Sequence, residues 1–242
     1  MKAICILCRK PDRIWCEFLN TFAKYKVFLM IDSFDFDTSE IEEIYQNLSF
    51  IKISDDTCRE YNYTNINYFV EKEVTSWEKA ILYFQHFNKN FDHVWFIEDD
   101  VFFYDENVIS KIDEQYKDED FLSRRPFNIG EKKEKWGPID SKFKEPFYSA
   151  MCCAVRMSKN MLNQIDNFRK DVKRFCFLEI LFPTIAINLN LNYKNPPELI
   201  SVLFNPDMSI KKKVFTDVLY TNLFHPVKDI YKHKIYREGI LH

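Results

Sequence analysis

Apolar runs of strand length alternate with helical periodicity along the first 104 residues. The runs cover residues 3–8, 26–31, 50–53 and 92–103. Asp12 precedes a stretch, residues 14–22, in which apolar side chains recur at helical spacing, and Ser76 precedes a similar stretch at residues 77–87. Both polar residues are suitable N-caps, so both stretches are predicted to be helices. Strands that alternate with helices predict βαβ units and a mostly parallel sheet with helices on both faces.

The rest of the chain is less regular, and residues 113–145 form a long polar stretch. We expect a long loop there, with room for one helix, because loops of that length inside a domain are usually functional lids or disordered segments. An apolar segment follows at residues 148–155, and Ser158 is placed to cap a helix over residues 159–168.

Residues 175–191 are strongly apolar but contain one carboxylate, Glu179, and one proline, Pro183. Proline lacks a backbone N–H and fixes its own φ angle, so Pro183 is predicted to begin or kink a helix there. A carboxylate in so apolar a run must face either a pocket or a partner of opposite charge.

Composition excludes several classes of binding protein. The 242 residues include 34 Lys+Arg and 37 Asp+Glu, for a net charge of -3, so no basic field is available for nucleic acid. Only 3 glycines occur, which excludes a Walker loop and a dinucleotide fingerprint, because both need backbone without a Cβ close to phosphate. If the protein binds a nucleoside diphosphate, a metal ion and side chains must meet its charge.

The cysteines and the N-terminal segment indicate a cytoplasmic protein. Seven cysteines, an odd number, without a secretory signal predict reduced thiols. Cys5 and Cys8 form a C-x-x-C pair inside an apolar run, but no second pair completes a zinc site, so we interpret them as core thiols. The first apolar run is too short for a signal sequence or a membrane span.

Acidic residues follow the second, third and fourth apolar runs. They are Asp32, then Asp55 and Asp56, and finally the cluster Glu98-Asp99-Asp100. In open α/β sheets ligands bind beyond the carboxyl ends of the strands, so we expect an acidic crevice at that edge. An acidic crevice can bind an anionic ligand only if a divalent cation stands between them.

The cluster Glu98-Asp99-Asp100 lies between apolar residues on both sides. Side chains alternate across a strand, so Glu98 and Asp100 are expected on one side and Asp99 on the other. Two carboxylates on one side form a site of the kind that Mg²⁺ or Mn²⁺ prefers. The alternative is a surface turn whose acids are merely solvated, although its flanks are unusually apolar for such a turn.

Residues 96–101, Phe-Ile-Glu-Asp-Asp-Val, resemble the D-x-D signature of the GT-A glycosyltransferases in an E-x-D form. The resemblance extends loosely to the strand order, to residues 76–80 and to residues 224–228. It implies an α/β, Rossmann-like GT-A fold: one domain, residues 1–242, with a nucleotide-binding half at 1–104 and an irregular acceptor-side half at 105–242. Richness in Lys, Asn, Ile, Phe and Tyr further indicates an A+T-rich genome, such as that of a large DNA virus.

The resemblance also implies roles for individual residues. Asp100 would bind Mn²⁺ or Mg²⁺, Glu98 would lie nearer the ribose of the donor, and His225 would complete the metal shell. Lys228 would contact the diphosphate as a point charge. The alternatives are that His225 is a packing residue and that Lys228 is solvated, as we also expect for the basic run at residues 211–213.

The predicted reaction moves a sugar from a nucleoside-diphosphate sugar to a hydroxyl acceptor, which we expect to be a glycan. Glu179 is the candidate base for an inverting transfer, and its alternative is a structural ion pair with Arg174 or Arg156. If Glu179 is not the base, a retaining mechanism is favoured. The positions that would help to hold the base or ribose are Asp32, Arg59 and Lys79, and those that would line the acceptor site are Trp136, Tyr148 and Ser149.

Two other classes of function remain open from the sequence. A Rossmann-like metal-dependent phosphohydrolase or nuclease would also use clustered acids, but no aspartyl nucleophile motif supports it. A catalytically inactive sugar-binding module would keep the fold without turnover. The donated sugar, the acceptor and the oligomeric state do not follow from the residue pattern.

Overall fold

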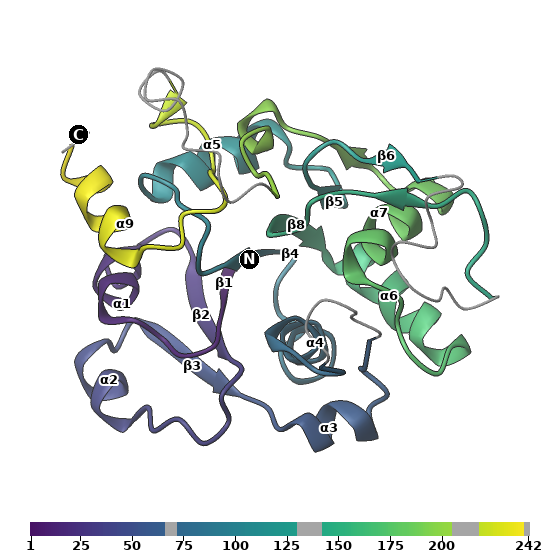
Figure 1. The fold of residues 1–242 in the computed structure, drawn as a ribbon, viewed down its shortest axis with the longest axis horizontal. Helices are drawn as coiled ribbons and strands as arrows, with labels where there is room; N and C mark the ends of the chain where they lie inside the picture. The colour runs from purple at the N-terminus through teal and green to yellow at the C-terminus, as the bar shows by residue number, and fades with distance from the viewer. Residues whose placement is uncertain (66–71, 130–141, 205–217, 240–242) are drawn as a thin grey trace.

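A seven-stranded sheet forms the centre of the molecule, in the order β3-β2-β1-β4-β8-β5-β9 (Figure 1). The computed structural model describes residues 1–65, 72–129, 142–204 and 218–239. The strands of the sheet are β1 (Lys2–Cys8), β2 (Lys26–Ile31), β3 (Leu48–Lys52), β4 (His93–Glu98), β5 (Phe121–Leu122), β8 (Ala154–Ser158) and β9 (Tyr193–Lys194). Strands β3, β2, β1 and β4 run parallel, whereas β8 is antiparallel to both β4 and β5. The predicted α/β class with a mostly parallel sheet is confirmed.

Helices cover both faces of this sheet (Figure 1). They are α1 (Arg13–Leu19), α2 (Ser39–Ile44), α3 (Asp55–Glu60), α4 (Ser76–Leu82), α5 (Glu106–Gln115), α6 (Lys159–Asp171), α7 (Leu178–Asn188) and α9 (Ile230–Arg237). A π-helical turn, η1 (Tyr83–Phe87), continues α4, a 3₁₀ turn, η3 (Pro197–Leu199), follows β9, and β6 (Phe127–Asn128) pairs with β7 (Tyr148–Ser149). Across the described residues, no helix combines the length and apolarity needed to cross a membrane.

Burial on both faces explains the continuous apolar run in β1. Ala3, Cys5 and Leu7 pack in one core cluster with α4, α6 and α7. Ile4 and Ile6 pack in a second cluster with α1 and α5 on the opposite face. Because successive side chains of a strand point to opposite faces, a strand with two covered faces needs apolar residues at every position.

Several predicted helix starts are confirmed, and one is wrong by one residue. Asp12 accepts a hydrogen bond from the backbone N–H of Ile14, and Ser158 caps α6. The cap of α4 is Thr75 and not Ser76, because Thr75 forms a reciprocal capping box with Glu78. The sequence carries this signal, because Glu78 lies three residues after Thr75, whereas Lys79 lies three residues after Ser76.

Two predicted strands differ in extent from those observed. The fourth strand was expected over residues 92–103, but β4 ends at Glu98, where the chain turns. The third strand begins earlier than expected, at Leu48. Helix α5, which follows this turn and packs on the same face of the sheet as α1, was not predicted.

The apolar segment around Pro183 forms one helix, α7, which begins at Leu178. The predicted helix is confirmed, but Pro183 lies inside it and does not begin it. A proline has no N–H to donate to the carbonyl four residues earlier, so the carbonyl of Glu179 is left free within the helix. That carbonyl accepts a hydrogen bond of 3.0 Å from the N–H of Ala150 instead. Pro183 therefore ties the chain leading into β8 to the first turn of α7.

The C-terminal segment returns to the end of β4. An antiparallel bridge joins Phe102 to Phe224, and a parallel bridge joins Val202 to His225. Helix α9 then packs against α1, where Arg237 lies 3.4 Å from the ring centroid of Phe18. These contacts place His225 beside the acidic cluster, although more than a hundred residues of chain separate them.

Candidate active site

Two carboxylates and an imidazole meet at the carboxyl end of β4. Glu98 is the last residue of the strand, and Asp100 lies in the turn after it. His225 Nε2 lies 3.3 Å from Asp100 Oδ1 and 4.0 Å from Glu98 Oε2. A backbone hydrogen bond of 2.7 Å from Val227 N–H to the carbonyl of Asp100 fixes the two segments together. The structure thus brings together Glu98, Asp100 and His225, three residues singled out from the sequence.

Asp99 faces a different environment from its two acidic neighbours. Its backbone carbonyl accepts a hydrogen bond of 2.8 Å from Trp15 Nε1, at the start of α1. Burial, followed by the charges of Asp100 and Glu98, raises the pKa of Asp99 to about 7. A carboxyl that is costly to ionise is a poor ligand for a cation, which argues against Asp99 as a metal ligand.

The surroundings of Asp100 and His225 fit a bound divalent cation. Asp100 Oδ1 is buried and makes no hydrogen bond to any described residue. His225 Nδ1 contacts the carbonyl of Leu203, which leaves Nε2 directed to Asp100. Burial alone would lower the pKa of His225, but its contact with Asp100 outweighs burial and raises that pKa. A buried carboxylate oxygen beside an imidazole nitrogen is an arrangement that either a protonated His225 or a bound cation would satisfy.

Glu179 lines a small cavity together with Glu98. The cavity has a volume of about 90 Å³, and its walls are Asn65, Thr75, Trp77, Glu98, Cys152, Phe177, Leu178 and Glu179. Glu179 Oε1 accepts a hydrogen bond of 3.3 Å from the N–H of Cys152. Burial raises the pKa of Glu179 to about 7 and the charge of Glu98 adds to this shift, whereas the hydrogen bond from the Cys152 backbone and the charge of His225 oppose it.

The alternative of an ion pair between Glu179 and an arginine is not what the structure shows. Arg174 pairs with Glu73 at 2.7 Å, and the buried Arg156 pairs with Asp113 at 2.8 Å. Glu179 therefore faces a pocket, and neither Arg174 nor Arg156 neutralises its charge.

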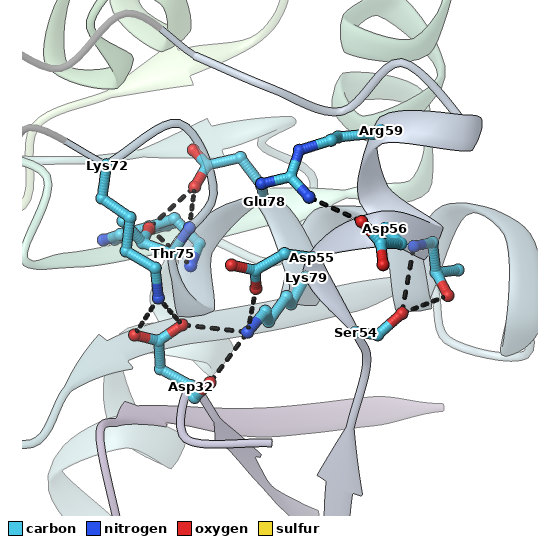
Figure 2. A network of polar contacts seen from close by, with 11 residues as sticks. Asp32, Ser54, Asp55, Asp56, Arg59, Lys72, Thr75, Glu78 and Lys79 are labelled. Carbon is cyan, nitrogen blue, oxygen red and sulfur yellow. Dashed lines mark hydrogen bonds and ion pairs between the residues drawn. The ribbon is translucent and has the colours of Figure 1, made fainter. Parts of the chain in front are cut away.

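Asp32 and Lys79 belong to a separate buried ion-pair network beyond the ends of β2 and β3 (Figure 2). Lys79 Nζ lies between two carboxylates, 3.0 Å from Asp32 Oδ1 and 2.8 Å from Asp55 Oδ1, and Lys72 Nζ lies 2.7 Å from Asp32 Oδ2. Burial opposes the ionisation of Asp32, but hydrogen bonds from Lys72 and Lys79 outweigh it and lower the pKa of Asp32. Only part of the expected acidic crevice therefore remains negatively charged, because Lys72 and Lys79 neutralise Asp32 and Asp55.

The two remaining candidates for nucleotide binding lie at the surface. Arg59 NH1 pairs with Asp56 at 2.6 Å and is half exposed (Figure 2). Lys228 is exposed and follows Val227, the residue bonded to Asp100. Neither side chain lies in the cluster of Glu98 and His225, although Lys228 is close to it along the chain.

Two residues of the site were missed by sequence reasoning. Trp77 Nε1 donates a hydrogen bond of 2.8 Å to Glu98 Oε1 and so holds that carboxylate in place. The Cys153 thiol lies with Glu98 and His225 in a group whose ligand atoms are all within 4.8 Å of one another. Neither contact has a local sequence signal, because each depends on how distant elements pack. Trp136 and the run at residues 211–213 lie outside the described residues.

Comparison with known proteins identifies the fold. An active-site mutant of LgtC aligns with 100% of this chain and 96% of its own, at 10% identity and a TM-score of 0.50. The galactosyltransferase LgtC in complex with donor and acceptor sugar analogues gives 11% identity, a TM-score of 0.48 and coverage of 99% and 96%. GlyE of Streptococcus pneumoniae, a glycosyltransferase, gives 8% identity, a TM-score of 0.48 and coverage of 98% and 64%.

No protein-family model and no curated protein sequence matches the chain. At such low identity the likeness to LgtC concerns the arrangement of the backbone. The chain has the GT-A fold of nucleotide-sugar glycosyltransferases, as the motif at residues 96–101 predicted.

Proposed function

We propose that this chain is a metal-dependent glycosyltransferase that moves a sugar from a nucleoside-diphosphate sugar to a hydroxyl acceptor, which we expect to be a glycan. The observation that carries the proposal is the meeting of Glu98, Asp100 and His225 at the carboxyl edge of a GT-A sheet. LgtC, whose fold this chain shares, is a galactosyltransferase. That activity is consistent with the proposal but says nothing about the sugar that this chain would transfer.

In this proposal Asp100 and His225 hold Mn²⁺ or Mg²⁺, and Glu98 lies beside them toward the donor. Such an ion would offset the charge that develops on the departing nucleoside diphosphate. Contacts with other residues hold these side chains in place: the indole of Trp77 orients Glu98, and the carbonyl of Leu203 orients the His225 ring. Ligands held by such outer contacts lose little freedom when they bind.

Glu179 is proposed to take the proton from the acceptor hydroxyl. A base works best when its pKa lies close to the working pH, and burial places the pKa of Glu179 at about 7. Its carboxylate shares the 90 Å³ cavity with Glu98, so an acceptor hydroxyl in that cavity would meet both Glu179 and the donor side of the site. This assignment corresponds to an inverting transfer, and retention of configuration in the product would contradict it.

The proposed contacts to the nucleotide remain Asp32, Arg59, Lys79 and Lys228. Lys228 is supported by its exposure and by its position three residues after His225. The ion pairs of Lys79 support an additional structural role, since its ammonium group already has carboxylate partners on two strand ends. A donor that contacts Asp32 would have to share it with Lys72 or displace that lysine.

A thermal-shift screen of nucleotide sugars, with and without Mn²⁺, tests the proposal. A donor that binds the native state raises the melting temperature by mass action, and the rise should require the ion. Asp100→Asn should abolish the metal-dependent rise while the protein stays folded, because the change removes a charge from a crowded acidic site. Asp99→Asn is the matched control and should have a milder effect. If Asp100→Asn retains full transfer activity, the metal assignment is wrong.

A further inference from the structure

Cys153 faces the proposed metal centre because of the register between β4 and β8. Ile97 pairs with Ala154 in this antiparallel ladder, and the N–H of Glu98 donates to the carbonyl of Cys153 at 2.8 Å. Cys153 is thus the residue directly opposite Glu98. Residues directly opposite each other in an antiparallel pair project their side chains to the same face, about 4.5–5.5 Å apart at Cβ. The pairing of β4 with β8 therefore keeps the thiol next to the Glu98 carboxylate.

The distances between these groups suit ligands of one ion. One donor atom each from Glu98, Cys153 and His225 lie within 4.8 Å of one another. His225 Nε2 is a further 3.3 Å from Asp100 Oδ1, the buried oxygen that makes no hydrogen bond to the described residues. Bonds of about 2.0–2.3 Å to a single ion place neighbouring ligand atoms roughly 3–4 Å apart. A small inward movement of the side chains would complete such a shell.

Among the described residues, the polar neighbours of the thiol are the Glu98 carboxylate and a sulfur atom. Its Sγ lies 3.6 Å from Met151 Sδ, a weak acceptor, so two sulfur atoms are adjacent at this edge of the site. Burial, followed by the charges of Glu98 and Glu179, raises the pKa of Cys153 well above its usual value. A bound ion would replace the thiol proton and hold the group as a thiolate.

We propose that Cys153 is a ligand of the ion held by Asp100 and His225, and that the centre therefore favours thiophilic ions such as Zn²⁺ and Co²⁺ over Mg²⁺. The inference rests on the proposed metal centre and adds to it the choice of ion. Binding forms one sulfur–metal bond and releases the thiol proton to solvent. Thiolate and imidazole select zinc-like ions, whereas carboxylate and water suffice for Mg²⁺.

The test is a spectroscopic titration of the metal-free full chain with Co²⁺. Wild-type protein should develop a sulfur-to-cobalt charge-transfer band in the near ultraviolet. Cys153→Ser and Cys153→Ala should lose the band and bind Zn²⁺ at least about tenfold more weakly, with a much smaller change for Mn²⁺. Zn²⁺ binds more tightly than Mn²⁺ at most sites, so a higher affinity for Zn²⁺ does not by itself identify a thiolate ligand. The diagnostic quantity is the loss of Zn²⁺ affinity when Cys153 is substituted.

Cys152→Ser is the matched control. Cys152 is also buried and lines the cavity of Glu98 and Glu179, but its Sγ faces the carbonyl of Ala150 and does not belong to the group of ligand atoms within 4.8 Å of one another. The control should keep the charge-transfer band. X-ray absorption on the wild-type zinc complex requires no substitution and should show one sulfur neighbour at about 2.3 Å.

The outcomes separate this inference from the proposed function. If Mn²⁺ and Co²⁺ bind and Asp100→Asn removes them, but no sulfur band or sulfur neighbour is found, the role of Cys153 is refuted and the proposed function stands. A band that survives in Cys153→Ser also refutes it, because another thiol must then be the ligand. If no divalent ion binds, the proposed metal dependence fails together with the inference.

Discussion

Replacing Glu179 by glutamine separates a catalytic carboxylate from a structural one. The substitution keeps the shape of the side chain and an oxygen that can accept the hydrogen bond from the N–H of Cys152. It removes the negative charge and the ability to take up a proton. Arg174 and Arg156 pair elsewhere, so the change leaves neither of these guanidinium groups without its partner. Stability and transfer rate should consequently respond in opposite directions.

The pKa of Glu179 determines the expected change in stability. Folding raises this pKa from 4.5 to about 7, so the native state binds the proton more tightly than the unfolded chain does. The free energy of unfolding must then fall as pH rises from about 4.5 to about 7, and stay level above that range. The pKa difference corresponds to a loss of up to about 3 kcal/mol. Glu179→Gln cannot suffer this loss, so above pH 7 the variant should be the more stable protein.

The assay compares wild-type and variant melting temperatures from pH 4 to 8 in the presence of a chelator, because a nearby cation would alter the field at Glu179. A gain of about 3 kcal/mol corresponds to roughly 6–12 °C for a domain of this size. The two proteins should have similar melting temperatures near pH 4.5 and diverge as pH rises. Glu78 and Asp99, whose pKa values are also raised to about 7, contribute equally to both proteins and cancel in the difference.

The transfer rate should move the other way. If Glu179 is the acceptor base, the variant should be slower by about 10²–10⁴-fold, with little change in donor affinity. The wild-type rate should rise with pH until the Glu179 carboxyl of the metal-loaded enzyme is ionised, because only the ionised carboxylate can accept the proton. An unchanged rate combined with a lower melting temperature at every pH would refute the reasoning, since Glu179 would then be a structural residue.

Three further predictions concern the packing around the site. Lys79→Met should destabilise the protein by about 1–3 kcal/mol in urea denaturation, because Asp55 loses its ammonium partner and Asp32 keeps only Lys72. Lys72→Met, at a partly exposed position, should cost at most about 1 kcal/mol; equal effects would contradict the network. Thr75→Ala should lower the free energy of unfolding by about 1 kcal/mol through loss of the capping box, whereas Ser76→Ala should change it by less than about 0.5 kcal/mol. The reverse order would show that Ser76 is the N-cap. Adding a chelator to Mn²⁺-loaded protein should lower the melting temperature of the wild type but not of Asp100→Asn, and an equal drop in both would place the ion elsewhere.

The sequence alone was sufficient for the elements whose signals are local. The apolar run of β1 and the cap at Asp12 predicted a strand and a helix that the structure contains, because burial on two faces and capping each depend on a few adjacent residues. The acids at the end of β4 were likewise visible, since charged residues rarely interrupt such an apolar run without a reason. The GT-A resemblance of residues 96–101 followed from that same local pattern.

Local patterns also misled where competing partners lay far away in the sequence. Asp32 and Asp55 follow strands just as Glu98 does, and their shared position predicted one acidic crevice. The side chain of Lys79 occupies the space between them, and an ammonium group at 2.8–3.0 Å satisfies both carboxylates without a metal. Periodicity places Lys79 on a helix but does not state which side of the sheet that helix covers.

Only the tertiary structure decided which groups share the site with Glu98. His225 could be read from the sequence as a ligand or as a packing residue, and the bridges of Phe102 to Phe224 and of Val202 to His225 place it beside Asp100. From the sequence Cys153 was only one of seven reduced thiols, and the register of β8 on β4 sets it opposite Glu98. Helix caps and strand alternation depend on neighbours along the chain, whereas the pairing of strands depends on the packing of the whole sheet, and a shift of one residue in that register would have turned the Cys153 thiol to the other face.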